Sequence, residues 1–350
     1  MSIETFELAP GYAISRVIRG GWQLAGGHGA VDEASVESDL LAYFEGGITT
    51  FDCADIYNGV EEKYGAFRET VRRRLGAEAL SRLKIHTKFV PDLDVLPVID
   101  KAYVRGVIER SLTRLHMERL DLVQFHWWDY AEPRCVETAL WLEALRQEGL
   151  IDRVAATNFD TPHLEAMVEA GVPLTSLQVQ YSLLDDRPAK TMAAACARLG
   201  VKLLCYGAIA GGFLSDRWLG APDPGYDFEN RSLVKYRLII DEFGGWTLFQ
   251  DLLAALQQIA SRQGAGISAV AARWTLDQPQ VAGVIVGARD RAHLERTLQI
   301  GAVRLTDDDR AALAAVLAQR RGPAGDVYAL ERDRTGRHGA IMKYNLSQPA

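Results

Sequence analysis

Short runs of β-branched and aromatic residues alternate along the chain with longer segments in which apolar residues recur every three or four positions. The short runs are typical of buried strands and the longer segments of amphipathic helices. The eight predicted strands begin at residues 17, 49, 84, 120, 151, 176, 201 and 281. Except after the seventh, successive strands begin roughly 25 to 36 residues apart, with a helical segment between them. This alternation predicts an α/β protein with a (β/α)8 barrel, and a doubly wound open sheet is the alternative.

Two segments interrupt the alternation before the last strand is reached. Residues 6–14 contain a Pro-Gly-Tyr turn between apolar positions, which predicts a small hairpin within an N-terminal segment of residues 1–15. Residues 207–246 are rich in Gly, Pro and aromatic residues, so we expect a long loop after strand seven that holds at most short helical pieces.

The C-terminal tail, residues 321–350, is polar and irregular. Its apolar residues gather at 327–330 and 341–342, which we expect to dock on the body of the protein. The whole chain is therefore predicted to be one barrel domain of residues 1–350. The N-terminal segment and the C-terminal tail are extensions of that domain.

Composition limits the class of protein and its partners. The 350 residues are 48% hydrophobic and 24% charged, which is typical of a soluble globular protein. The net charge of −7 disfavours nucleic acid or an anionic membrane as a partner. The first residues have neither the basic nor the apolar region of a signal peptide, so we expect none, and no uncharged apolar run approaches the roughly 18 residues of a membrane span. We expect a cytoplasmic protein, and a homo-oligomer is possible.

Two further patterns argue against metal binding and against an open-sheet dinucleotide site. The four cysteines (Cys53, Cys135, Cys196 and Cys205) lack CxxC or zinc-finger spacing, so we expect reduced thiols and no metal. Residues 264–269 match the G-x-G-x-x-A pattern but follow a helical segment rather than a strand. A helix end followed by a new helix explains them better.

Polar and aromatic side chains mark the ends of the predicted strands. In a barrel, chemistry lies at the carboxyl ends of the strands and in the loops that follow. That rule selects Trp22, Asp52, Tyr57, Lys88, His126, Asn158, Gln180, Tyr206 and Gly287. Asp52 ends a buried strand, where an unpaired charge costs on the order of several kcal/mol. Lys88 ends the next strand and is its expected partner.

Tyr57 follows Asp52 by five residues and suggests proton transfer. A free tyrosine has a pKa of about 10, but an adjacent ammonium favours the phenolate. We therefore expect Lys88 to lower the pKa of Tyr57 and to make it an effective general acid. His126 is expected to donate a hydrogen bond that orients a carbonyl oxygen. A structural ion pair and a core histidine are the alternatives that involve no catalysis.

Together with four other segments, these residues resemble the aldo-keto reductases. Asp52, Tyr57, Lys88 and His126 match the order and spacing of the family's catalytic tetrad. The other segments are ATNF (156–159), QVQYS (178–182), CYGAIAGG (205–212) and IVGAR (285–289), the last followed by His293-Leu294. The resemblance covers about residues 16–305. It implies an NAD(P)H-dependent oxidoreductase that reduces an aldehyde or ketone to an alcohol, with Tyr57 as the general acid.

The resemblance also implies a nicotinamide site at the barrel mouth. Thr157, Asn158 and Gln180 would hold the carboxamide of the cofactor, and Tyr206 would stack on its ring. The following loop would wrap the pyrophosphate with backbone N–H groups through Gly207, Ala208, Ile209 and Gly211. This loop lacks the Ser-Pro-Leu that the family often has after the stacking aromatic.

At the adenine end the implied cofactor residues are Gly287, Arg289, His293, Arg296 and Thr297. Arg296 and Thr297 stand where the family usually has a Glu-Asn pair, and His293 replaces a Gln or Arg. Arg289, with Arg296 close by, could clamp a 2′-phosphate, so we expect NADP(H), with NAD(H) as the alternative. An ordinary solvated helix face would explain the same arginines.

The substrate site is predicted to be aromatic. Trp22, Trp127 and Trp128 are the candidate substrate-binding residues, and the aromatic residues of the 207–246 loop could widen the same funnel. Such a lining favours aromatic or apolar carbonyl compounds, or sugars that stack on indole faces.

Two other functions use the same residues. The chain could be a cofactor-sensing regulatory barrel without significant turnover, although a complete tetrad argues against a purely regulatory role. It could also be a lyase or isomerase that uses Lys88 and Tyr57 without redox chemistry. Cofactor titration separates these alternatives from a reductase.

Overall fold

Eight parallel strands close into a barrel in the computed structural model, which describes residues 3–26, 29, 31–288 and 290–346. The strands are β3 (Val17–Gly20), β4 (Thr50–Asp52), β5 (Lys84–Phe89), β6 (Leu120–Phe125), β7 (Ile151–Thr157), β8 (Ser176–Gln180), β9 (Lys202–Tyr206) and β10 (Val281–Gly287). Each strand pairs with the next along the chain, and β10 returns to β3, with Gly287 opposite Gly20. This last pairing confirms the barrel, because an open sheet would leave two edges.

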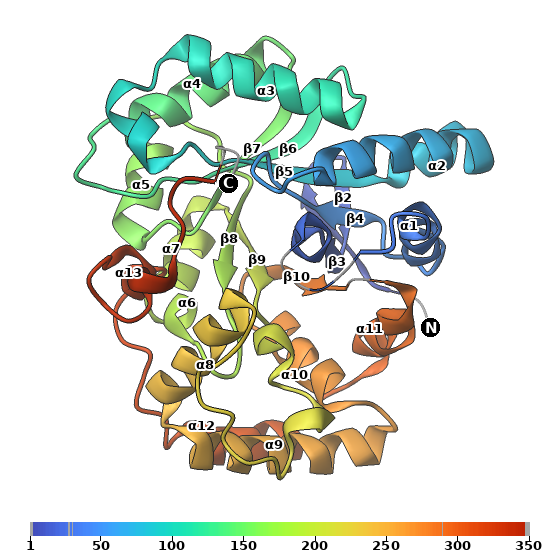
Figure 1. Cartoon of the computed structure of the whole chain (residues 1–350), viewed down its shortest axis with the longest axis vertical. Coiled ribbons are helices and arrows are strands. Elements are labelled where there is room, and N and C mark those ends of the chain that lie inside the picture. Colours follow the sequence, from blue (N-terminus) through green and yellow to red (C-terminus); the bar gives the residue numbers. More distant parts are fainter. Residues whose placement is uncertain (1–2, 27–28, 30, 289, 347–350) are drawn as a thin grey trace.

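Helices surround the barrel on its outer face (Figure 1). They are α1 (Val36–Glu45), α2 (Val60–Arg82), α3 (Lys101–Leu115), α4 (Cys135–Gln147), α5 (Thr161–Glu169), α6 (Arg187–Lys190), α7 (Met192–Leu199), α9 (Trp246–Gln263), α10 (Ile267–Leu276), α11 (Leu294–Ala302) and α12 (Asp307–Leu317). Short 3-10 turns are η1 (Trp22–Ala25), η2 (Leu93–Val98) and η5 (Arg291–His293). Side-chain caps start several helices: Asp100 accepts a hydrogen bond from the Tyr103 amide, and Thr306 with Asp309 forms a capping box.

The N-terminal hairpin predicted at residues 6–14 is present. It consists of β1 (Thr5–Ala9) and β2 (Tyr12–Ser15), paired antiparallel. Its buried Leu8 and Ile14 share a small core with Leu122 and Leu204 from inside the barrel. The hairpin therefore covers the amino-terminal end of the barrel, opposite the end where the strands finish.

The loop predicted over residues 207–246 is wrong in its second half. After the turns η3 (Ala210–Gly212) and η4 (Asp216–Trp218), residues Arg231–Phe243 form the helix α8. Asn230 caps it by accepting a hydrogen bond from the Ser232 amide. The helix buries its Leu238, Ile239, Ile240 and Phe243 side chains. Because a Gly/Pro-rich stretch precedes α8, the sequence pattern assigned the apolar residues of this helix to the loop.

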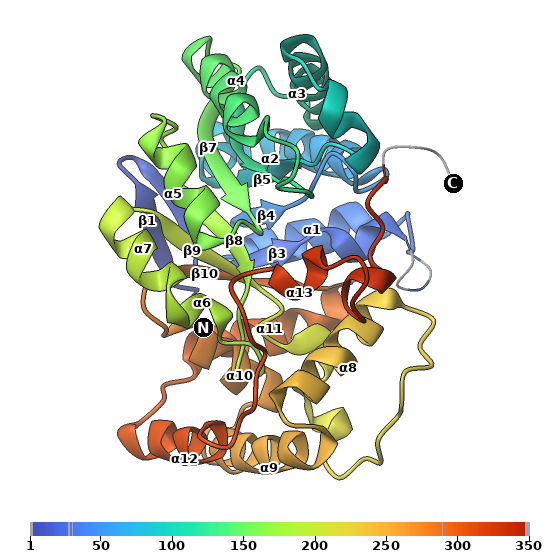
Figure 2. The same ribbon diagram turned by 90° about the vertical axis from the view of Figure 1, so that its left-hand side faces the viewer.

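The C-terminal tail packs onto the mouth of the barrel. From α12 it rises past α6 to a short helix, α13 (Ala329–Arg332), which lies beside α8 (Figure 2). A 3-10 turn, η6 (Gly339–Ile341), follows. Val327 and Tyr328 are buried, which confirms the first predicted docking point, whereas Ile341 and Met342 are half-buried.

Among the described residues, no helix combines the length and the apolar character that a bilayer crossing requires.

Candidate active site

Lys88 and Asp52 form a buried ion pair at the ends of the neighbouring strands β5 and β4. The Lys88 Nζ lies 2.6 Å from the Asp52 Oδ2, and both side chains are nearly inaccessible to solvent. The same ammonium donates to the Cys53 carbonyl at 2.8 Å and lies 3.5 Å from the Tyr57 hydroxyl. The structure thus brings together the carboxylate, cation and phenol that the sequence placed in adjacent strand ends.

Two glutamines that were not among the predicted site residues also bind the Asp52 carboxylate. Gln124 of β6 and Gln178 of β8 both donate to the Asp52 Oδ1, at 2.8 and 2.6 Å. Gln178 also donates to the Gln124 Oε1 at 2.7 Å. The carboxylate is therefore fully engaged and fixed in orientation. An amide side chain within an otherwise apolar buried strand was the signal that could have identified them.

The protonation of Tyr57 differs from the expectation. Burial raises the pKa of Tyr57, and the nearby Lys88 ammonium offsets only part of that effect, so the net change is upward. Burial by itself would lower the pKa of Lys88, but the Asp52 carboxylate raises it above its ordinary value. Lys88 is thus charged and Tyr57 is a protonated phenol at neutral pH. This is the state that a proton donor requires.

His126 follows β6 and is held by the end of β7. Its Nδ1 lies 3.1 Å from the Thr157 carbonyl oxygen, which can only accept, so we assign the ring proton to Nδ1. Burial, with Arg332 and Lys88 adding to it, lowers the pKa of His126 to about 3, so the ring is neutral. Its buried Nε2 has no hydrogen-bond partner among the described residues. His126 therefore offers an acceptor at Nε2, not the predicted donor.

The three candidate tryptophans have different surroundings. Trp22 lies next to the tetrad, with its ring centroid 4.8 Å from that of Tyr57. Trp128 packs edge-on against His126, at 4.2 Å between centroids. Trp127 is fully buried, packs on Phe125 and donates to the Asp129 and Glu132 carbonyls. The prediction that Trp127 lines the substrate site is therefore wrong, because this ring points into the core.

The residues expected to hold the nicotinamide lie together at the mouth. Asn158 follows β7 with a left-handed backbone, φ 63°, and its Oδ1 accepts a hydrogen bond from the Tyr206 hydroxyl at 2.9 Å. The buried Gln180 at the end of β8 donates to Asp185 at 2.8 Å, and its Oε1 has no partner among the described residues. The carbonyl of the adjacent Thr157 is the one that holds His126.

Helix α8 covers the ring and loop that were expected to contact the cofactor. The Lys235 Nζ lies 4.9 Å from the ring centroid of Tyr206, and 5.7 and 5.8 Å from those of Tyr236 and Tyr328. Tyr236 packs on the loop after β9, where a Cβ added to Gly211 would lie 2.6 Å from its ring. Gly211 also has φ 63°, so the turn requires glycine there. Ala208 is buried in this loop, and Ile209 is partly buried.

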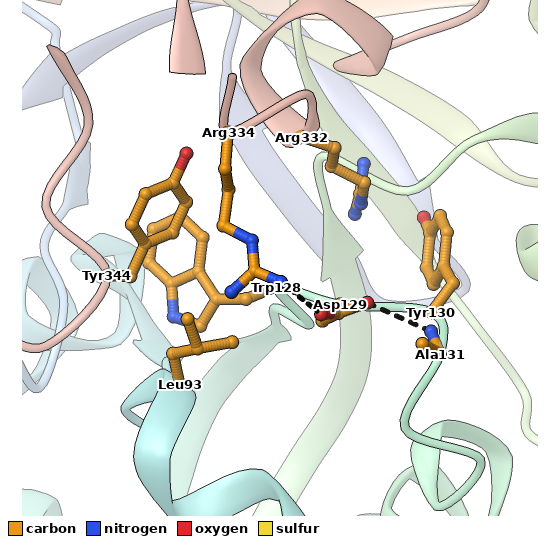
Figure 3. A pocket seen from close by; sticks show the side chains of 8 residues that line it. All are labelled: Leu93, Trp128, Asp129, Tyr130, Ala131, Arg332, Arg334 and Tyr344. Atoms are coloured by element: carbon orange, nitrogen blue, oxygen red, sulfur yellow. Dashed lines mark hydrogen bonds and ion pairs between the residues drawn. The ribbon is translucent and has the colours of Figure 1, made fainter. Parts of the chain in front are cut away.

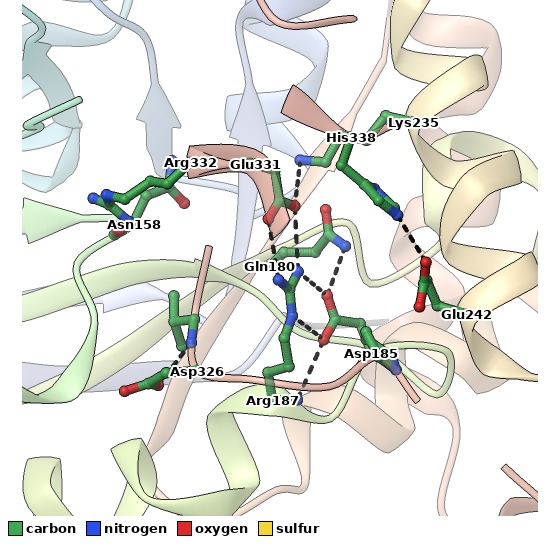
Figure 4. Close-up of polar contacts among 12 residues, drawn as sticks. Asn158, Gln180, Asp185, Arg187, Lys235, Glu242, Asp326, Glu331, Arg332 and His338 are labelled. Atoms are coloured by element: carbon green, nitrogen blue, oxygen red, sulfur yellow. Dashed lines mark hydrogen bonds and ion pairs between the residues drawn. The ribbon is translucent and has the colours of Figure 1, made fainter. Parts of the chain in front are cut away.

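A second ionic cluster fixes the tail over this region (Figure 4). The Arg187 guanidinium is paired with Asp185 at 2.7 Å and with Glu331 of α13 at 3.0 Å, and all three side chains are buried. The Lys235 Nζ lies 3.9 Å from Glu331. Burial would raise the pKa of Glu331, but Arg187 and Lys235 lower it to about 2. The tail is thus anchored by a carboxylate that stays ionised.

The adenine-end residues are less organised. A Cβ at Gly287 would lie 2.2 Å from the Gln23 Nε2, so a larger residue there would displace the Gln23 side chain. The exposed His293 contacts Asp290, and the buried Thr297 hydroxyl donates to the His293 carbonyl. Arg296 is exposed, and Arg289 lies outside the described residues. The predicted phosphate clamp therefore stays a prediction.

No cluster of three or more metal-ligating side chains occurs in the described part of the chain. Its four cysteines are free and buried.

The model of the aldo/keto reductase family matches residues 16–318. The chain belongs to this family. The family match ends before the tail that carries Tyr328, Glu331 and Arg332. The tail contacts therefore lie outside the segment that the family model matches.

Relatives and solved structures support the same placement. The chain is 35% identical to the flagellar radial spoke protein 5 of Chlamydomonas reinhardtii over 258 residues, which are 64% of this chain and about half, 49%, of that protein. It is 26% identical to the aldo-keto reductase YhdN of Bacillus subtilis, covering 88% of this chain and 91% of that protein. An aldo/keto reductase from Klebsiella pneumoniae, solved with NADP and acetate, superposes with a TM-score of 0.70 at 21% identity, covering 93% and 100% of the two chains.

Proposed function

We propose that this aldo/keto reductase reduces an aldehyde or ketone to an alcohol with a nicotinamide cofactor, and that Tyr57 is the proton donor. The observation that carries the proposal is the Tyr57 hydroxyl 3.5 Å from an ammonium that is itself ion-paired to Asp52 at 2.6 Å. A protonated phenol beside a fixed cation can release its proton only as negative charge forms on a neighbouring oxygen. That is the requirement of carbonyl reduction.

Each residue of the site has a separate role in the proposed reaction. A nicotinamide cofactor held at the mouth would supply the hydride for the carbonyl carbon. Tyr57 transfers its phenolic proton to the carbonyl oxygen, and solvent later restores that proton. Lys88 stabilises the phenolate that remains, while Asp52, Gln124 and Gln178 hold the ammonium and its counter-charge in place. His126 Nε2 accepts a hydrogen bond from the hydroxyl of the product alcohol.

Two features of the mouth fit a nicotinamide. The buried Gln180 Oε1 lacks a donor among the described residues, and a carboxamide NH2 would supply one. The aromatic Tyr206 offers a face for stacking, and its hydroxyl is fixed by Asn158. Lys235 lies over that ring, so it must shift or share the face when cofactor binds. The solved relative with NADP supports NADP(H) as the cofactor, and NAD(H) is the alternative.

The test is a titration of tryptophan and tyrosine fluorescence with NADPH and NADH, followed by NADPH oxidation with a panel of small aldehydes and ketones. The account predicts saturable quenching, tighter for NADPH, and stoichiometric alcohol formation. Quenching by neither cofactor would contradict the proposal and would favour a lyase or isomerase that uses Lys88 and Tyr57.

One observation supports a second candidate, a cofactor-sensing barrel with little turnover. Lys235 lies over the ring of Tyr206 and also contacts the ring of Tyr328, and Glu331 anchors the tail at the mouth. Tight NADPH binding without oxidation by any member of the panel would select this function over the reductase.

A further inference from the structure

A pocket of about 220 Å³ lies beside the barrel mouth, between the β6–α4 loop and the C-terminal tail (Figure 3). Its walls include Leu93, Trp128, Tyr130, Arg332, Arg334 and Tyr344. We call it the Arg332 pocket. Three aromatic rings and two guanidinium groups face a space large enough for a small organic group.

Arg332 has no counter-ion among the residues that the structure describes. Its guanidinium lies 4.0 Å from the ring centroid of Tyr130, and it donates to the Asn158 and Trp127 carbonyl oxygens at 2.9 Å each. Both acceptors are neutral, and Arg332 forms no ion pair with any residue that the structure describes. A guanidinium has five N–H donors, so donors remain after these two bonds. A partly buried charge of this kind is stabilised by an anion.

The second arginine leaves the lining positive. Arg334 pairs with Asp129 at 3.0 Å, and this pair is partly open to solvent. Asp129 is the one carboxylate in the lining, set against two guanidinium groups. The pocket thus favours a ligand with a negative group, and its aromatic walls favour a flat body attached to that group.

The Arg332 pocket adjoins the proposed catalytic centre. Trp128 forms its wall and packs on His126 with 4.2 Å between ring centroids. Tyr344 from the tail packs on the same indole at 5.2 Å. Trp128 therefore belongs both to the wall of the pocket and to the surroundings of His126.

We propose that the Arg332 pocket binds the anionic group of the substrate, so that the preferred substrates are planar carbonyl compounds that carry a carboxylate. The proposal rests on the proposed reductase function, and it adds the substrate class. Arg332 is the specificity-determining residue, and Arg334 neutralises Asp129, so the lining keeps a net positive charge. A phosphate on the same body offers the same kind of acceptor and is distinguished by experiment.

The first measurement compares 4-carboxybenzaldehyde with methyl 4-formylbenzoate, which has a similar shape without the charge. The wild-type enzyme is expected to prefer the carboxylate by on the order of 10- to 100-fold in kcat/KM, mainly through KM. Equal values for the two compounds would overturn the proposal. A larger preference for an aryl phosphate aldehyde would reassign the anion from carboxylate to phosphate.

The second measurement uses variants in the tail. Arg332→Gln is expected to remove most of the preference, Arg332→Lys to keep part of it, and Arg334→Gln to reduce it. The matched control is Arg337→Gln, an exposed tail arginine that pairs with Asp241 outside the pocket, which should leave the preference unchanged. An equal loss on both substrates in Arg332→Gln would show that Arg332 only clamps the tail, and would contradict the proposal.

A binding assay separates this proposal from the reductase function. Calorimetry with the unreactive terephthalate should show binding that Arg332→Gln weakens on the order of tenfold or more. Binding of terephthalate without turnover of any aldehyde would contradict the proposed function and keep the anion site. Turnover of the neutral ester with no terephthalate binding would support the proposed function and contradict the anion site. Because Arg332→Gln could fold poorly, Arg334→Gln provides an independent readout.

Discussion

Lys88 and Arg187 are both buried cations near the barrel mouth, but their surroundings differ. Lys88 has one carboxylate, Asp52, and directs a remaining donor toward the Tyr57 hydroxyl. Arg187 has two carboxylates, and its guanidinium contacts Asp185 and Glu331 through Nε, Nη1 and Nη2. A cation that contacts the hydroxyl of a reacting group can act on that group. One whose side-chain bonds all go to fixed carboxylates holds structure.

The two pairs also differ in how far apart in sequence their partners lie. Asp52 and Lys88 end neighbouring strands, so the barrel itself brings them together. Glu331 reaches Arg187 across 144 positions, through a tail outside the family match. The first cluster is therefore expected to control turnover, and the second to control whether the tail stays on the mouth.

Replacing Lys88 should have the largest effect. Lys88→Met removes the cation beside Tyr57 and leaves Asp52 buried without a partner. We expect single-turnover NADPH oxidation to fall by about 10²- to 10⁴-fold, and the free energy of unfolding to fall by roughly 3–5 kcal/mol. Lys84→Met, at the half-buried start of the same strand, is the control. Wild-type turnover in Lys88→Met would contradict the claim that the cluster of Lys88 and Asp52 controls turnover.

Arg187→Met should cost stability more than chemistry. Two buried carboxylates lose their cation, so urea denaturation should show a loss of about 3–5 kcal/mol. Arg198→Met, which removes an exposed surface pair with Glu165, should cost less than about 1 kcal/mol. If Arg187→Met abolished turnover in a protein of unchanged stability, the two clusters would not differ as described.

Glu331→Gln should have the smallest effect, and that effect should depend on pH. Its carboxylate has a pKa of about 2 in the folded chain, below the ordinary 4.5, so its contribution to stability is present above pH 4.5. That contribution is lost as the pH falls through this window toward 2. The stability difference between wild type and Glu331→Gln should therefore shrink between pH 4.5 and 2. A difference that stays constant, or tail proteolysis equal in both proteins, would argue against the anchor.

Sequence reasoning reached the barrel and the tetrad because both depend on local patterns. Alternating apolar runs define the strands, and parallel strands bring Asp52, Lys88 and His126 to one end. The role of Glu331 depends on a partner far away in the chain. By its local pattern it resembles an ordinary charged residue in a polar tail.

The electrostatic expectations failed for a different reason. The pKa of Tyr57 depends on the balance between burial and the Lys88 charge, and no sequence pattern gives the degree of burial. The proton position on His126 depends on a backbone carbonyl, that of Thr157, which every residue possesses. Trp127 was misplaced because two adjacent tryptophans at a strand end point in different directions.

The central claim is that Tyr57 donates the proton, and Tyr57→Phe tests it most directly. This variant keeps the ring that packs on Trp22 and removes only the hydroxyl 3.5 Å from Lys88. In a single-turnover experiment with saturating NADPH and a good aldehyde, the account predicts unchanged cofactor quenching and a rate of NADPH oxidation lowered by about 10²-fold or more. Wild-type oxidation rates in Tyr57→Phe would contradict it.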